Sequence, residues 1–121
     1  MKKHLHLVLL CIFSVCLGLK AEVYSGECGK TGINLSWTLD TEIGELVISG
    51  EGEMNNNPWI AYKDYIRSVS IQDGVLNIVN SAFADCSNLA NVTIAETVSK
   101  IEYYAFLRCT SLNSCSIPSS V

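Results

Sequence analysis

The feature that most constrains this chain is a 23-residue repeat in its second half. Apolar residues recur at this step through three successive units, and further residues recur through two. The triples are Ile71, Ile94 and Ile117; Val75, Val98 and Val121; Ile66, Leu89 and Leu112; and Val69, Val92 and Cys115. The pairs are Ile78 and Ile101, Ala82 and Ala105, Phe83 and Phe106, and Cys86 and Cys109. A fixed period of this length predicts a solenoid, in which each unit buries its apolar side against the next.

Within one unit, the pattern predicts a short strand and a helical return. Apolar side chains alternate in residues 89–94, which indicates a strand, and residues 85–88 are turn-like. In residues 99–108 the apolar residues have helical spacing, which predicts a short helix or 3-10 segment. The expected fold class is therefore an α/β repeat solenoid.

Stacking of the units also gives Cys86 and Cys109 a structural role. Equivalent positions in adjacent units should lie about 5 Å apart, a separation that a disulfide can bridge. Cysteine also behaves as a small apolar residue, which favours buried free thiols. Zinc requires four ligands in close pairs, and these spacings do not supply them. We expect no metal and no cofactor.

The N-terminal range 1–21 has the features of a signal peptide. It begins with two lysines, continues with the apolar stretch Leu7–Leu19 and ends on Ala21, a small residue before a cleavage point. The apolar stretch is shorter than the roughly 20 residues that span a bilayer. The alternatives are a retained membrane anchor and a lipoprotein modified at Cys16. We expect a secreted or cell-surface protein with no stable membrane span after processing.

Removal of this leader changes the chemistry of the chain. Residues 22–121 contain 5 basic and 12 acidic residues, a formal net charge of 5 − 12 = −7, and no histidine. This charge disfavours nucleic acid and anionic membranes as partners, because both require clustered cations. Without histidine the usual nucleophile–base pairs cannot form. Glu51 and Glu53 flank a glycine at a hairpin end and are interpreted as solvated turn acids rather than a glycosidase pair. We expect no enzymatic activity.

The 23-residue period is absent from Glu22 to Tyr65, and residues 22–64 are expected to form a cap. Residues 35–39 alternate as a strand, residues 40–45 form a polar turn, and residues 46–50 form a return strand, which together predict a β-hairpin. Pro58 is well suited to the first position of a short helix. Such end units cover the exposed edge of a solenoid. We expect Trp37 and Trp59 to be buried in this cap rather than to serve as sugar-stacking platforms.

Several of these motifs together indicate a family. They are Cys28-Gly29, the segments 35–39 and 44–54, the Pro58-Trp59 and Tyr62 stretch, and the Ala-Phe-x-x-Cys repeats. This arrangement resembles BspA-like leucine-rich-repeat surface proteins. The resemblance implies a right-handed leucine-rich-repeat coil preceded by a hairpin cap. Members are typically secreted or surface-exposed, and some are adhesins toward host matrix or plasma proteins, so a binding module is implied but no particular ligand.

The repeat region, residues 65–121, holds about 2.5 units by its 23-residue period and stops at Val121 within a unit. Cys115 replaces the apolar residue found at Val69 and Val92, and no polar cap follows it. We therefore expect either a fragment of a longer array or end-to-end association through the open last repeat.

The strand residues expected to point away from the core define the candidate ligand-binding face. They are Arg67, Ser68, Ser70, Ala90, Asn91, Thr93, Asn113, Ser114 and Ser116. Our first hypothesis is that this face binds an extracellular protein or glycan. The alternative is a structural spacer or capping module of a larger surface protein, with no ligand of its own.

Overall fold

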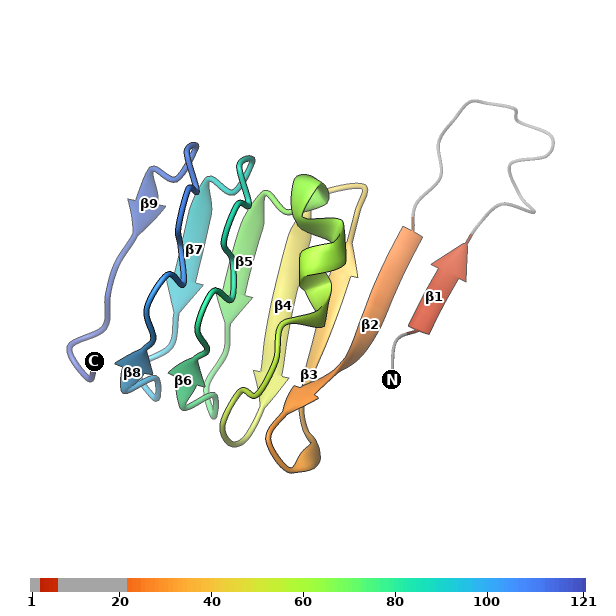
Figure 1. Ribbon diagram of the computed structural model, residues 1–121. Helices are drawn as coiled ribbons and strands as arrows, with labels where there is room; N and C mark the ends of the chain where they lie inside the picture. The colour runs from red at the N-terminus through yellow and green to blue at the C-terminus, as the bar shows by residue number, and fades with distance from the viewer. Residues whose placement is uncertain (1–2, 7–21) are drawn as a thin grey trace, which may run out of the picture.

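The computed structural model describes residues 3–6 and 22–121, which form short strands and one 3-10 helix (Figure 1). The strands are β1 (Lys3–His6), β2 (Glu22–Gly29), β3 (Gly32–Asp40), β4 (Glu45–Gly50), β5 (Ser68–Ile71), β6 (Asn77–Ile78), β7 (Asn91–Ile94), β8 (Lys100–Ile101) and β9 (Ser114–Cys115), and the helix is η1 (Pro58–Tyr65). Most of the expected signal peptide, residues 1–2 and 7–21, lies outside the described residues.

The main sheet has seven strands in the order β1-β2-β3-β4-β5-β7-β9. Strands β1 to β4 pair antiparallel, whereas β4, β5, β7 and β9 pair parallel. Strands β6 and β8 form a separate parallel pair. Figure 1 shows η1, β6 and β8 in a second layer that covers one side of the main sheet. The apolar core lies between these two layers.

The N-terminal hairpin is confirmed. Strands β3 and β4 pair from Leu35 opposite Gly50 to Asp40 opposite Glu45. The turn closes with a 2.8 Å hydrogen bond from the Gly44 N–H to the Asp40 carbonyl, and Gly44 has a φ of +74°, which favours glycine. The expected short helix is also present, since η1 begins at Pro58.

The stack of repeat units begins with β4, one unit earlier than the residue pattern indicated. Leu46 pairs with Val69 and Ile48 pairs with Ile71, both at a step of 23 residues, and Gly52 forms a bridge to Val75 at the same step. The expectation that the period is absent from Glu22 to Tyr65 is therefore wrong for β4. This strand belongs both to the hairpin and to the stack, so only part of the repeat pattern survives in it.

The expected helical return over residues 99–108 is wrong. That segment consists of β8 followed by turns at residues 103–108. An α-helix needs N–H groups bonded to carbonyls four residues earlier. Here carbonyls of residues 99–108 accept hydrogen bonds from the equivalent segment of the preceding repeat unit. The Phe83 N–H donates to the Ala105 carbonyl and the Asp85 N–H donates to the Leu107 carbonyl, both at 2.8 Å.

Backbone conformation prevents a helix at the same place. Four residues in the two returns have a positive φ, at equivalent positions in both: Ser81 and Tyr104, and Asp85 and Arg108. A left-handed residue interrupts a right-handed helix. Thus the repeats are leucine-rich-repeat-like in their strands, but their returns are turns.

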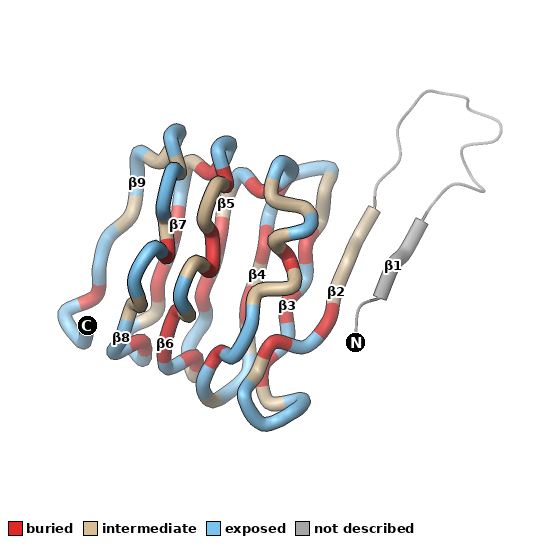
Figure 2. Tube along the Cα trace, in the orientation of Figure 1, coloured by how far each residue is buried: buried red, intermediate tan, exposed pale blue. Residues whose placement is uncertain are grey.

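Figure 2 shows buried positions recurring along the successive coils. Aromatic rings stack through this core: the centroids of Trp59 and Phe83 are 5.7 Å apart, and those of Phe83 and Phe106 are 5.5 Å apart. Trp37 and Trp59 are at most 1% exposed, so their expected burial is confirmed. The indole N–H of Trp59 donates to the Ala82 carbonyl at 2.8 Å, which ties the cap to the first return.

Candidate functional site

The side of the main sheet opposite the core carries rows of short polar side chains. Successive residues in a strand point to opposite faces, so the buried Val69 and Val92 alternate with outward neighbours. Strand pairing aligns these neighbours into rows. One row is Glu45, Ser68, Asn91 and Ser114, and the next is Val47, Ser70 and Thr93. We call these two rows, with the exposed Ser116 after β9, the strand face.

The structure brings together six of the nine residues that the sequence singled out. They are Ser68, Ser70, Asn91, Thr93, Ser114 and Ser116. The other three, Arg67, Ala90 and Asn113, lie just before the strands rather than within them. Their backbones form hydrogen bonds between neighbouring repeat units. The Asn113 N–H donates to the Ala90 carbonyl at 3.0 Å, and the Ala90 N–H donates to the Arg67 carbonyl at 2.9 Å. They border the strand face at one edge.

The rows continue onto the cap, which sequence reasoning missed. Asp40 lies opposite Glu45, and Thr38 lies opposite Val47. The available signal was the 23-residue step itself, since Glu45 and Val47 precede Ser68 and Ser70 by one period. The cap end of the face is more acidic than the repeat end, where hydroxyl and amide groups dominate.

A shallow hollow of about 420 Å³ opens beside the strand face. Its lining residues are Ser70, Ile71, Gln72, Asp73, Thr93 and Ala95. Ser70 and Thr93 are adjacent members of one row, and Gln72 and Asp73 follow the end of β5. The hollow offers hydroxyl, amide and carboxylate groups, which can form hydrogen bonds to a polar ligand.

The thiols are placed for packing. Cys28, Cys86, Cys109 and Cys115 are all free. Burial raises the pKa of the Cys28 and Cys86 thiols to about 12, and thiols in this state are poor nucleophiles. The thiol of Cys109 donates to the Phe83 carbonyl at 3.1 Å, which spans two coils. Within residues 3–6 and 22–121, no group of three or more His, Cys, Asp or Glu residues is arranged to hold a metal ion.

An ion pair joins neighbouring returns. The Arg108 guanidinium donates to both carboxylate oxygens of Asp85, with the longer contact at 3.3 Å. This hydrogen bond holds the pKa of the exposed Asp85 carboxyl below its ordinary value. The pair lies on the returns, away from the strand face, and links equivalent positions of two coils.

The alignment of strands at 23-residue steps agrees with a family model. The model for the BspA type leucine rich repeat region matches residues 59–121, just over half of the chain. This chain belongs to the BspA-type leucine-rich-repeat family. Such repeat proteins are generally non-catalytic, and those of the BspA type are typically secreted or surface-exposed.

A solved leucine-rich repeat protein from Eubacterium ventriosum ATCC 27560 has a similar structure. The two chains share 29% sequence identity with a TM-score of 0.58. The similarity covers 65% of this chain and 22% of the other, so this chain spans only a small part of that protein's length. No curated protein matches the chain. Within the described residues, no helix is both long and apolar enough to cross a membrane.

Proposed function

We propose that this protein is a secreted or cell-surface, non-catalytic binding module whose strand face contacts an extracellular protein. The observation that carries this proposal is the alignment of outward, mostly polar side chains into two rows, one over β4, β5, β7 and β9 and one over β4, β5 and β7. The rows present hydroxyl and amide groups on a regular backbone, and a protein surface can hydrogen-bond to such groups without large rearrangement.

The dimensions of the face support binding over several coils. The four strands of the strand face, β4, β5, β7 and β9, span about 19 Å at roughly 4.8 Å per strand, and a four-residue strand is about 13 Å long. The resulting area of about 250 Å² is about a third of the ~800 Å² that a standard interface buries on each partner. The ligand therefore also contacts neighbouring loops, such as that of Gln72 and Asp73, or further coils of a longer solenoid.

A panel of purified matrix and plasma proteins, captured on a surface carrying this protein, tests the proposal. The variant Asn91→Trp with Thr93→Arg fills the rows with bulky groups, and Arg67→Glu reverses the charge at their edge. We expect the double variant to lose capture at least about tenfold with an unchanged melting temperature, because these side chains are exposed. The matched control is Asn80→Trp, an exposed position on a return. Unchanged capture by the strand-face variants would count against this function.

The second candidate function is a spacer within a larger surface protein. It is favoured by the similarity to only 22% of the longer solved chain. In that case the last coil docks against another repeat unit end to end, and no panel protein is captured by either the parent or the variants. Sedimentation of the purified chain measures the end-to-end association directly.

A further inference from the structure

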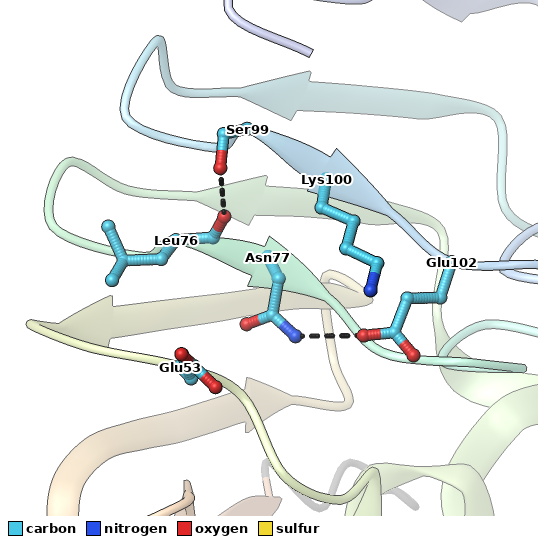
Figure 3. Close-up of a pocket in the computed structure, with 6 residues that line it drawn as sticks. All are labelled: Glu53, Leu76, Asn77, Ser99, Lys100 and Glu102. Atoms are coloured by element: carbon cyan, nitrogen blue, oxygen red, sulfur yellow. Dashed lines mark hydrogen bonds between the residues drawn. The ribbon is translucent and has the colours of Figure 1, made fainter.

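A second hollow lies at the β6–β8 pair, away from the strand face. It has a volume of about 240 Å³ and is lined by Glu53, Leu76, Asn77, Ser99, Lys100 and Glu102. Figure 3 shows Lys100 and Glu102 extending from the β8 segment toward Asn77, with Glu53 on the other side of the hollow. These residues come from three successive coils, so only stacking brings them together.

The hollow is lined at positions where an earlier coil carries an apolar residue and a later coil carries a polar one. Glu102 stands one period after Val79, which packs against the core. Asn77 and Lys100 stand one and two periods after Met54, which is buried. Asn77 is only 8% exposed. Buried polar groups are costly unless they are bonded, so a polar residue in place of a packed apolar one is a candidate for a functional role.

Among the polar side chains of the hollow, Asn77 is held by hydrogen bonds, whereas Lys100 and part of the Glu102 carboxylate are available to a ligand. The Asn77 side-chain carbonyl accepts the Met54 N–H at 2.6 Å, and its amide donates to one carboxylate oxygen of Glu102 at 3.2 Å. The ammonium of Lys100 makes no hydrogen bond or ion pair with any residue that the structure describes. The Glu102 carboxylate and the Lys100 ammonium can therefore serve as acceptor and donor for a ligand.

The charges around the hollow balance. Glu53 and Glu102 carry two negative charges, Lys100 carries one positive charge, and Lys30, which is 3.2 Å from Glu53, carries the other. A site of zero net charge gives neither a cation nor an anion an electrostatic advantage. It favours a neutral ligand that both donates and accepts hydrogen bonds.

Two exposed tyrosines follow the hollow residue Glu102 in the sequence, outside the lining of the hollow itself. Tyr103 and Tyr104 directly follow Glu102, are 67% and 60% exposed, and have ring centroids 5.1 Å apart. The equivalent residues one coil earlier are Asn80 and Ser81. Tyr104 also has a φ of +62°, which is uncommon for a bulky residue. The same turn thus exchanges small polar side chains for two large rings in the coil that carries Lys100 and Glu102.

We propose that the hollow and the Tyr103–Tyr104 pair form a binding site for one neutral sugar unit of a glycan. Sugar hydroxyls donate to the Glu102 carboxylate and accept from Lys100, while the apolar C–H face of the ring packs on a tyrosine. The volume is below the ~300–1,000 Å³ of pockets for drug-sized ligands, which suits a single pyranose ring. This site is separate from the strand face and goes beyond the protein-binding function proposed above.

Saturation-transfer NMR with N-acetylglucosamine, galactose, mannose and fucose, each titrated separately at millimolar concentration, tests this site. We expect at least one of these sugars to bind the parent chain. Two variants restore residues that the chain itself uses one coil earlier: Glu102→Val, and Tyr103→Asn combined with Tyr104→Ser. Each should weaken binding about tenfold or more, because Glu102→Val removes a charged acceptor and the other removes the ring contact.

The strand-face variant Asn91→Trp with Thr93→Arg is the matched control and should leave the sugar dissociation constant unchanged. The tyrosine variant alters only exposed side chains, so it remains informative if Glu102→Val lowers the melting temperature. The proposal is overturned if no sugar of the panel binds the parent chain, or if binding persists unchanged in both restoring variants. Loss of sugar binding with intact capture of a protein on the strand face would separate the two sites.

Discussion

At the scale of single residues, the cysteines illustrate how the stack assigns a role to a side chain. Cys86 and Cys109 occupy equivalent positions in adjacent coils, yet both are free thiols. Cys86 and Cys28 are at most 1% exposed. Their burial removes the water that would stabilise a thiolate, which explains their raised pKa values. In this protein the thiols act as small apolar groups.

These thiols predict a loss of stability at alkaline pH. Folding raises the pKa of Cys28 and Cys86 from 9.0 to about 12. Their contribution is therefore fully present below pH ~9 and is lost as the pH rises toward ~12. We expect the thermal midpoint to fall through this window, and to fall less in the variant Cys28→Ala with Cys86→Ala.

Tyr24 adds to the same trend, because its hydrogen bond to Glu22 raises the pKa of its hydroxyl to about 12. Part of the alkaline slope should therefore remain in the double variant. Parallel slopes in the parent and the cysteine variant, measured by circular dichroism, would contradict the assignment to the thiols.

At the scale of the elements, the returns combine isolated turns, such as the 3.2 Å bond from the Leu107 N–H to the Tyr104 carbonyl, with bonds between coils, and they form no continuous helix. Ser81 and Tyr104 adopt the same positive φ in successive returns, at 60° and 62°. The N–H of Ser81 donates to the Tyr103 carbonyl at 3.2 Å in the next coil. The left-handed residue thus turns its N–H group toward the neighbouring coil, where it finds an acceptor.

Ser81→Gly should stabilise the protein. The left-handed conformation costs a residue with a Cβ about 1–2 kcal/mol, and glycine adds about 0.5–1 kcal/mol of unfolded-state entropy. The balance is a gain of about 0.5–1 kcal/mol in the free energy of unfolding, measured by chemical denaturation. The neighbouring variant Asn80→Gly, without a positive φ to relieve, should instead lose about 0.5–1 kcal/mol. Equal effects of the two substitutions would show that backbone strain at Ser81 is negligible.

At the scale of the whole molecule, the stability of each coil depends on the coils next to it. Strands β5 and β7 each have a strand on both sides, whereas β9 pairs with β7 alone among the described strands. In such a one-dimensional stack, each unit is stabilised mainly by its immediate neighbours. Local opening is therefore expected to begin in the last coil of the 121-residue chain.

Hydrogen exchange can measure this gradient with two matched amides. Ala90 donates to the Arg67 carbonyl at 2.9 Å, and Asn113 donates to the Ala90 carbonyl at 3.0 Å, at the same position of successive coils. We expect the Asn113 amide to exchange at least about tenfold faster, because its coil opens at a lower free energy. Equal protection of the two amides would indicate that the coils unfold as one cooperative unit.

The order of apolar residues along the chain was sufficient to identify the repeat and most of its strands, whereas the family was indicated by the resemblance of the cap and Ala-Phe-x-x-Cys motifs. Ile71 and Ile94 recur at one step and are buried as the alternation predicts, whereas Ile117, one step later, is 55% exposed. The hairpin and the helix at Pro58 also followed from local signals, because turns and helix starts depend on residues close together in sequence. Most of the strand face could be predicted too, because the alternation of side chains within one strand also depends on residues close together in sequence.

Other features depended on contacts between coils. The spacing of Ile101, Ala105 and Phe106 fits a helix, but the segment forms isolated turns whose carbonyls also accept bonds from the neighbouring coil. The early start of the stack at β4 and the hollow around Asn77 join residues 23 or more positions apart. A linear pattern specifies which residues seek burial. Which backbone and polar groups find partners is decided only when the coils stack, because each unpaired buried group is costly.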